Sequence, residues 1–323
     1  MNFEKDIKVN RVLDIYSKLM CGEILNKKDM AQLYNVNEKT IQRDIDDIRN
    51  FFYENKDSMG LKEVVYKRDK KGYCIKNNDI DMITKEDILV IMKILLESRA
   101  FCKRELNHLT NSILALVDIS QRKNIKELIG NELLNYVPLN HNKLLLSKIW
   151  EFSEFIRYCE KVEITYIKIN NIEVKREIKP VAIIFSEYYF YLIAYFNDFK
   201  LPTIFRIDRI KSYRKIGEKF YISNRDRFEE GEFRKRIQFM YSGRLTKIRF
   251  EFWGSSLEAV LDRIPTAIVI DKYNSKFLIE AEVYGEGIIK WILSQGANIK
   301  VLTPLEIKEK IINEAKNIVD IYN

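Results

Sequence analysis

The chain has 323 residues, which is enough for two or three domains of ordinary size. Hydrophobic residues make up 46% and charged residues 32%, a globular balance that excludes a disordered or low-complexity protein. The formal net charge of +8 favours polyanionic partners. The longest apolar run, residues 188–196, has nine residues against the ~20 that span a bilayer, so we expect no membrane segment. The first residues lack the apolar core of a signal peptide, and we expect a cytoplasmic protein.

Residue types that carry metal or nucleophilic chemistry are few and scattered. The four cysteines form no Cys-x-x-Cys pair, which argues against a zinc site and against a disulfide framework. His108 and His141 have no nearby partners of the kind that a metal site or a catalytic triad needs, so ordinary surface or core roles are expected. We therefore expect no metal, no cofactor and no enzymatic activity. An enzyme acting on nucleic acid is the least favoured function.

The positive charge is unevenly distributed. Residues 1–80 hold 16 Lys and Arg against 14 Asp and Glu, a net of only +2. Residues 161–225 hold 13 against 7, a net of +6. The middle of the chain is therefore the most basic region, and a polyanionic ligand is expected there.

Apolar spacing predicts three helices near the N-terminus. They cover residues 6–20, residues 28–34 and a segment that begins at Glu38, for which Asn37 is a good N-cap. The third helix turns an apolar face inwards, made of Ile41, Ile45, Ile48 and Phe52. Asp44, Asp46 and Asp47 could suggest a metal cluster, but on a helix Asp44 points away from the other two, and a solvated face is the simpler interpretation.

The other face of the third helix is polar and basic. It carries Lys39, Gln42, Arg43 and Arg49. Side chains near the N-terminus of such a helix can reach base edges in the major groove. Gln42 can bind adenine, and Arg43 can bind guanine or a phosphate. The alternative is a generic three-helix bundle with a solvated charged face.

A basic hairpin is predicted after the three helices. Residues 64–67 and 73–76 read as strands, joined by a Gly-closed turn that can touch phosphates as a wing. We expect double-stranded DNA to contact Asn37, Lys39, Thr40, Gln42, Arg43, Arg49, Arg68, Lys70 and Lys71.

The middle of the chain changes from helical to strand-like periodicity. Residues 80–159 are mostly helical and connect the two halves, with a possible part in dimerisation. Short strands follow at residues 162–167, 175–185, 188–196 and 204–210. Several such strands in about 60 residues predict a small barrel or a curled sheet.

The aromatic strand at residues 189–196 has two distinct faces. Alternation places Phe190, Leu192, Ala194 and Phe196 on the core face. It places Tyr189, Tyr191, Ile193 and Tyr195 on the other face, where tyrosine hydroxyls would be available to a ligand.

The last region predicts a compact α+β module. Strands are expected from Lys247, at 267–271, at 277–284 and at 299–302, with helices at 256–264, at 287–294 and from Pro304. Trp253 and Trp291 are expected to pack within it.

Two motifs resemble known families. Asn37-Glu-Lys-Thr-Ile-Gln-Arg-Asp-Ile-Asp-Asp-Ile48 resembles the recognition helix of DeoR-like winged regulators, in which a Thr-Ile-x-Arg-Asp core is typical. Residues 161–215 resemble a WYL domain, with Phe190-Tyr191-Leu192 in place of the Trp-Tyr-Leu tripeptide. The Phe keeps an apolar ring for packing but has no indole N–H.

Companion segments extend this resemblance over nearly the whole chain. They are Ile164-Thr-Tyr166, Arg176-Glu-Ile-Lys-Pro180 and Phe205-Arg-Ile-Asp-Arg-Ile210. Trp291-Ile-Leu-Ser-Gln-Gly296 through Val301-Leu-Thr-Pro304 is similar to the C-terminal extension called WCX.

The resemblance implies a homodimeric transcription regulator whose WYL domain is an Sm/SH3-like barrel. Such domains are thought to bind anionic effectors, in some members single-stranded nucleic acid. The effector residues expected here are Tyr166, Arg176, Tyr189, Tyr191, Arg206 and Arg209. The alternative for Arg206 is a structural ion pair with Asp208, which alternation would place on the same face.

The predicted architecture is thus α+β and multidomain. It comprises a winged helix-turn-helix at 1–78, a helical connector at 79–140, a WYL domain at 141–225 and a WCX module at 243–323. The predicted function is a regulator that binds an operator in double-stranded DNA and whose WYL domain senses an anionic effector, a nucleic acid or a nucleotide. The alternative is an accessory nucleic-acid-binding protein that modulates a partner enzyme.

Overall fold

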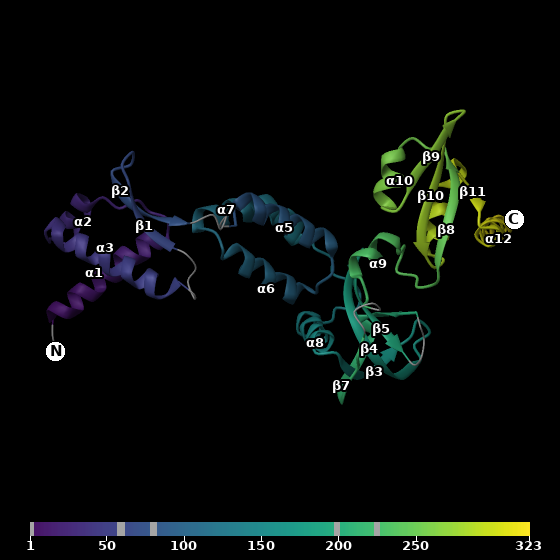
Figure 1. Cartoon of the computed structure of the whole chain (residues 1–323), viewed down its shortest axis with the longest axis horizontal. Coiled ribbons are helices and arrows are strands. Elements are labelled where there is room, and N and C mark those ends of the chain that lie inside the picture. Colours follow the sequence, from purple (N-terminus) through teal and green to yellow (C-terminus); the bar gives the residue numbers. More distant parts are fainter. Residues whose placement is uncertain (1–2, 57–61, 78–82, 197–200, 223–226) are drawn as a thin grey trace. The chain divides into compact units, whose positions relative to one another are not determined.

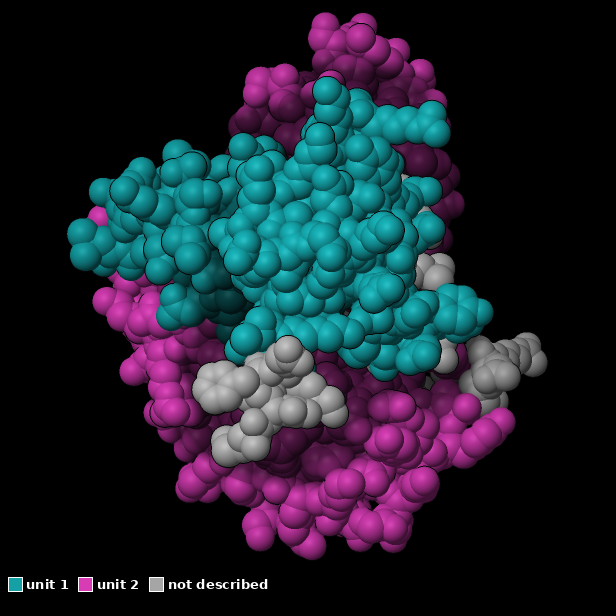
Figure 2. Space-filling model, turned by 90° about the vertical axis from the view of Figure 1, so that its left-hand side faces the viewer, with its two compact units in different colours: residues 1–94, 110–134 teal, residues 95–109, 135–323 magenta. Residues whose placement is uncertain are grey.

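The computed structural model describes residues 3–56, 62–77, 83–196, 201–222 and 227–323, with elements labelled in Figure 1. It divides into two compact units, coloured separately in Figure 2. Unit 1 holds residues 1–94 and 110–134, and unit 2 holds residues 95–109 and 135–323. The predicted boundary between residues 78 and 79 and the predicted end at residue 225 lie outside the described residues. The division into four domains stays a prediction.

Unit 1 begins with the three predicted helices and the hairpin. These are α1 (Phe3–Met20), α2 (Lys27–Leu33), α3 (Glu38–Glu54), β1 (Lys62–Lys67) and β2 (Gly72–Asn77). The inward face of α3 forms a core with α1 and the hairpin, and all four predicted residues on it are at most 2% exposed. Gly72 is required in the hairpin because a Cβ there would lie 2.6 Å from the Ile24 side chain.

Three further helices continue the chain, as the apolar periodicity predicts. They are α5 (Lys85–Ser98), α6 (Lys103–Leu114) and α7 (Ile119–Leu134). The boundary between the units falls within α5 and again within α6, so both helices run from one unit into the other. None of the described helices is long and apolar enough to cross a bilayer.

Unit 2 contains a five-stranded antiparallel sheet next to α8 (Leu146–Arg157). Its strands are β3 (Glu160–Ile167), β4 (Glu173–Ser186), β5 (Tyr189–Phe196), β6 (Thr203–Arg206) and β7 (Ile210–Lys219), in the order β6-β5-β4-β3-β7. No hydrogen-bonded pairing joins β6 to β7 among the described residues, so the sheet is open and the expected barrel is not closed. The strand predicted at 204–210 is interrupted by a 3-10 turn, η1 (Ile207–Arg209).

Apolar side chains cover both faces of this sheet. The predicted core face is confirmed, since Leu192 and Ala194 are fully buried with α8 residues such as Phe152. The other face is also covered, because Ile193 is fully buried against Phe233 of α9 (Glu230–Arg236). The expectation of an open face is therefore wrong at Ile193, whereas Tyr189, Tyr191 and Tyr195 on the same face are only partly buried.

The C-terminal α+β module has a four-stranded antiparallel sheet in the order β11-β8-β10-β9. Its elements are β8 (Leu245–Phe252), α10 (Leu257–Arg263), β9 (Ile268–Tyr273), β10 (Lys276–Tyr284), α11 (Gly287–Ser294), β11 (Ile299–Thr303) and α12 (Leu305–Tyr322). Trp291 packs in its core, as expected. Trp253 is 36% exposed, with the Lys276 ammonium 4.5 Å from the centre of its ring.

Candidate nucleic-acid and effector sites

The N-terminus of α3 presents free cationic side chains. The side-chain oxygen of Asn37 accepts hydrogen bonds from the backbone N–H of Thr40 at 2.8 Å and from its hydroxyl at 2.9 Å. This confirms Asn37 as the N-cap, a role that already occupies its carbonyl. Lys39 and Arg43 lie on the first two turns and are exposed, without an ion pair to any described residue. They can reach an anionic surface without breaking a contact.

Two other predicted DNA-binding residues are instead held by the hairpin. The Gln42 side-chain oxygen accepts hydrogen bonds from the Tyr73 hydroxyl at 2.7 Å and from Lys27 Nζ at 3.1 Å. Arg49 donates to the Val64 carbonyl at 2.9 Å, and its guanidinium lies 5.4 Å from the centre of the Tyr73 ring. Gln42 and Arg49 therefore fix α3 against the hairpin.

The tip of the hairpin is basic and open to solvent. Arg68, Lys70 and Lys71 are all exposed. Asn26, the N-cap of α2, donates from its side chain to the Lys71 carbonyl at 2.9 Å. The tip is thus tied to the start of α2 while its three cationic side chains stay available.

Asp44 has a structural role that the sequence interpretation missed. Its carboxylate is fully buried and accepts two hydrogen bonds from Arg11, at 2.6 Å from Nε and 3.2 Å from Nη2. The hydrogen bond to Asp44 raises the pKa of Arg11. The assignment of Asp44 to a solvated face is therefore wrong, because the α1 side chain reaches across to it. No group of acidic, His or Cys side chains suited to a metal ion occurs among the described residues.

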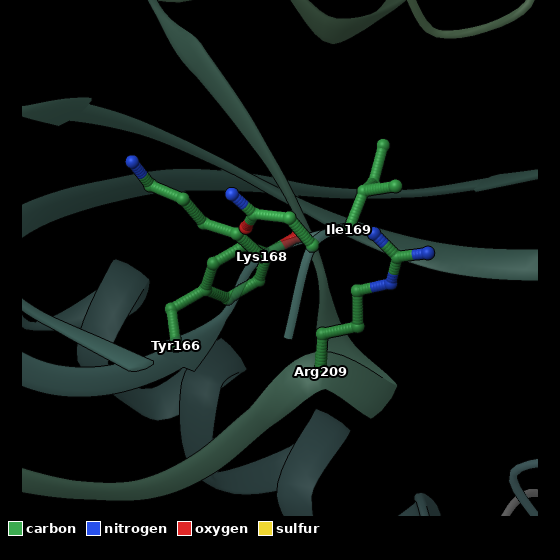
Figure 3. Close-up of a pocket in the computed structure, with 5 residues that line it drawn as sticks. Tyr166, Lys168, Ile169 and Arg209 are labelled. Carbon is green, nitrogen blue, oxygen red and sulfur yellow. The ribbon is translucent and has the colours of Figure 1, made fainter. Parts of the chain in front are cut away.

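An open pocket of about 400 Å³ lies beside η1 (Figure 3). It is lined by Tyr166, Lys168, Ile169, Asn170 and Arg209. In Figure 3 the Arg209 side chain extends from η1 towards Ile169, which belongs to the turn between β3 and β4. Lys168 and Arg209 make no ion pair with any described residue. Two free cations, an amide and an aromatic ring can hold a phosphate-bearing ligand.

The pocket unites only some of the predicted effector residues. Tyr166 and Arg209 were expected, whereas Lys168 and Asn170 were missed. Both missed residues lie in a polar turn between two predicted strands, which is where binding residues often occur.

Arg206 does not line this pocket but adjoins it, because its backbone N–H donates to the Tyr166 hydroxyl at 3.3 Å. Its guanidinium makes two hydrogen bonds to Asp208, at 3.0 and 2.8 Å, and lies 3.4 Å from the centre of the Tyr189 ring. Tyr191 is opposite Arg206 on β5 and is partly buried, and burial raises the pKa of its hydroxyl. Arg206 thus makes the structural ion pair given as its alternative, although Asp208 lies within η1 and not in a strand.

The segment with these features matches one known family. Residues 151–215 match the family model described as the WYL domain. Residues 151–215 are a WYL domain. This segment carries all six predicted effector residues and four of the five strands in full.

Within the WYL domain, Arg176 does not line the pocket. Its guanidinium is 4.7 Å from the centre of the Phe196 ring and donates to the Lys175 carbonyl at 3.2 Å. Phe190, at the position of the family Trp, packs against Phe185 and Phe101 at ring distances of 5.0 and 5.6 Å. Phe190 is thus a packing residue, as expected.

Similarity to solved structures is weak at the level of the whole chain. Proteasome accessory factor B/C (PafBC) of Arthrobacter aurescens is 12% identical with a TM-score of 0.28, over 95% of this chain and 46% of that one. A CRISPR Cas-related protein is 15% identical with a TM-score of 0.37, over 76% of this chain and 75% of that one. The chain thus spans less than half the length of PafBC. Comparison with curated proteins gives no match.

Proposed function

We propose that this protein is a DNA-binding transcription regulator whose WYL domain senses an anionic effector. The observation that carries the proposal is the pocket of Tyr166, Lys168 and Arg209, in which both cations are free of ion pairs within the described residues. The same chain begins with three helices and a basic hairpin, and this order fits a winged helix-turn-helix coupled to a sensor.

On the DNA side, the start of α3 is the proposed recognition element. Arg43 and Lys39 contact base edges or phosphates in the major groove, with Asn37 and Thr40 nearby at the cap. Arg68, Lys70 and Lys71 contact backbone phosphates. Gln42 and Arg49 hold the hairpin, and a base contact by Gln42 requires it to exchange its bond to Tyr73.

A homodimer on paired half-sites completes the proposal. One small helical unit contacts few base pairs, so two copies related by a two-fold axis give specificity to a palindromic operator. Light scattering of the free protein and of its DNA complex tests this, and a monomer in both states contradicts it.

On the effector side, we infer a ligand that bears phosphate. Single-stranded nucleic acid is one candidate. Lys168 and Arg209 attract the phosphate, and the Tyr166 side chain lines the pocket beside them. Stacking of a base on an aromatic side chain contributes ~1–3 kcal/mol. Cation contacts to phosphates release counterions, so affinity for the ligand falls as salt rises.

Selection and sequencing of DNA fragments bound by the purified chain identifies the operator. Arg43→Ala is then expected to weaken operator binding by ~1–3 kcal/mol, the usual value of a lost base contact. Lys56→Ala is the matched control, because Lys56 is an exposed cation just beyond the other end of α3. Equal affinities of the two variants would remove Arg43 from the recognition surface.

The effector arm is tested with a labelled single-stranded oligothymidylate of about ten nucleotides. Lys168→Ala and Arg209→Ala are expected to weaken its binding and to leave operator binding intact in the absence of effector. A chain that binds the oligonucleotide but selects no DNA duplex would instead be the accessory nucleic-acid-binding protein.

A further inference from the structure

Arg209 lies in a turn whose backbone carbonyls are hydrogen-bonded to two lysines. Lys143 Nζ donates to the Asp208 carbonyl at 2.6 Å, and Lys148 Nζ donates to the Ile210 carbonyl at 2.7 Å. These carbonyls belong to the residues immediately before and after Arg209. The orientation of the Arg209 backbone is therefore fixed on both sides by ammonium groups from another part of the chain.

The two lysine ammonium groups are hydrogen-bonded to backbone carbonyls at the ends of this turn. Both are partly buried, and burial lowers the pKa of Lys148. Neither makes an ion pair with a described carboxylate. A buried ammonium needs hydrogen-bond acceptors, and the backbone of η1 provides them. The positions of the lysines and of η1 therefore depend on each other.

The same segment is anchored at its centre by Glu105 of α6. Glu105 Oε1 accepts hydrogen bonds from the backbone N–H groups of Leu145 and Leu146, both at 2.7 Å. Leu145 precedes α8 and provides no side-chain cap of its own, so Glu105 caps α8 from another helix. Glu105 is only 6% exposed. Glu105 is thus hydrogen-bonded to the short segment that also carries Lys143 and Lys148.

We propose that Lys143 and Lys148 are positioning residues of the effector pocket, and that Glu105 carries a displacement of residues 143–148 into α6. This inference rests on the proposed function, because it states how ligand binding in the pocket changes other residues. Ligand binding at Arg209 shifts η1, the lysines follow its carbonyls, and the cap of α8 changes at Glu105. The change at Glu105 then acts on α6, the helix that carries this residue.

The experiment uses the full chain with Lys143→Met and Lys148→Met, singly and together. Lys211→Met is the matched control, since Lys211 is an exposed cation of β7 paired with Glu173, not with η1. Hydrogen exchange of the peptide that contains Ile207–Ile210 is measured without any ligand. Because the Ile210 N–H bonds to the Ile207 carbonyl within η1, its exchange is expected to accelerate in the lysine variants and to stay unchanged in the control.

Binding of the labelled oligothymidylate separates positioning from contact. The double lysine variant is expected to bind the oligonucleotide about tenfold more weakly than the wild type. The slope of log Kd against log salt is expected to stay the same, because Lys143 and Lys148 do not contact the phosphate in the wild type. Arg209→Met is expected to lower the slope by about 0.7, the value for one phosphate contact on a single strand. Lys148→Arg keeps a donor for the Ile210 carbonyl. It is therefore expected to bind the oligonucleotide more tightly than Lys148→Met, close to the wild-type affinity.

Glu105→Ala tests the second step. The oligonucleotide is expected to alter hydrogen exchange in α6 of the wild type but not in α6 of Glu105→Ala. The Kd of Glu105→Ala for the oligonucleotide is expected to stay within about twofold of the wild-type Kd. Glu105→Gln keeps the acceptor Oε1 and is expected to retain the response.

The outcomes are distinguishable. Unchanged exchange at η1 in the double lysine variant overturns the positioning role, whether or not the oligonucleotide binds. A reduced salt slope in that variant also overturns it, since the lysines would then contact the ligand. An α6 response that persists in Glu105→Ala overturns the transmission step. Failure of the wild type to bind the oligonucleotide counts against the proposed effector class and leaves the exchange result decisive for positioning.

Discussion

The ion pair between Arg11 and Asp44 predicts a large and localised loss of stability on Asp44→Ala. Asp44 is fully buried and Arg11 is 8% exposed, so removal of the carboxylate leaves a buried guanidinium without its two acceptor contacts. Breaking a buried pair in this way costs ~3–5 kcal/mol. A domain has ~5–15 kcal/mol of stability in total, so the helices of unit 1 should lose a large part of theirs.

The chain offers a way to observe this loss in unit 1 alone. All three tryptophans, Trp150, Trp253 and Trp291, belong to unit 2. Urea unfolding followed by tryptophan fluorescence therefore reports unit 2, whereas far-ultraviolet circular dichroism reports both units. Asp44→Ala is expected to move part of the dichroism transition to lower urea and to leave the fluorescence transition in place.

Asp47→Ala is the matched control on the same helix. Asp47 pairs with Lys8 at 2.9 Å, but both side chains are more than half exposed, so its loss should cost under about 1 kcal/mol. Replacing both members of the buried pair, with Arg11→Met and Asp44→Leu, should recover most of the stability that Asp44→Ala loses. If Asp44→Ala and Asp47→Ala unfold at the same urea concentration, the reasoning about the buried pair is refuted.

Other predictions concern unit 2. Burial lowers the pKa of His141 from its ordinary 6.5, so the folded state disfavours the proton. The contribution of neutral His141 to the free energy of unfolding is therefore fully present above about pH 6.5. It is lost as the pH falls below that value and through the lowered pKa of the folded state. His141→Asn should flatten this acid loss in thermal unfolding followed by fluorescence, and exposed His108→Asn should not. Ile193→Ala should cost ~2–5 kcal/mol in fluorescence-monitored unfolding, because it leaves a cavity under Phe233, and a cost near zero would contradict that packing.

The helices and strands were predictable where one periodicity dominated. The steps of four, three and four between Ile41, Ile45, Ile48 and Phe52 suffice to orient α3, because one core receives all four side chains. The cap at Asn37 was equally local, since its partner is three residues away. The burial of Asp44 was not predictable in this way, because its partner Arg11 lies on another helix.

The second face of β5 shows a different reason for failure. Alternation gives two faces but does not say whether one is solvated, and tyrosines were assigned to solvent because they carry hydroxyls. The strand is apolar or aromatic throughout, a composition typical of strands buried on both faces. The covering residue, Phe233, follows some 40 positions later in the seven-residue helix α9, which is too short for a periodic pattern.

The turn η1 could have been recognised from its own spacing. Ile204, Ile207 and Ile210 recur at steps of three, which suits a 3-10 turn better than a strand, and the last two are fully buried. A strand would already place Arg206 and Arg209 on opposite faces, because they are three residues apart, and the turn changes which neighbours each one meets. One pairs with Asp208, and the other lines the pocket.

The charge count and the pocket carry different information about the proposed effector. A net of +6 in residues 161–225 sets the sign of the surrounding potential, and that sum is unchanged by folding. Folding then pairs several of the cations with acids, as it does Arg214 with Glu163 and Arg206 with Asp208. A cation with a fixed carboxylate partner must break that bond before it binds phosphate, whereas Lys168 and Arg209 carry no such cost within the described residues. The sequence therefore favours an anionic ligand, and the pairing in the fold indicates which cations the proposed ligand could meet.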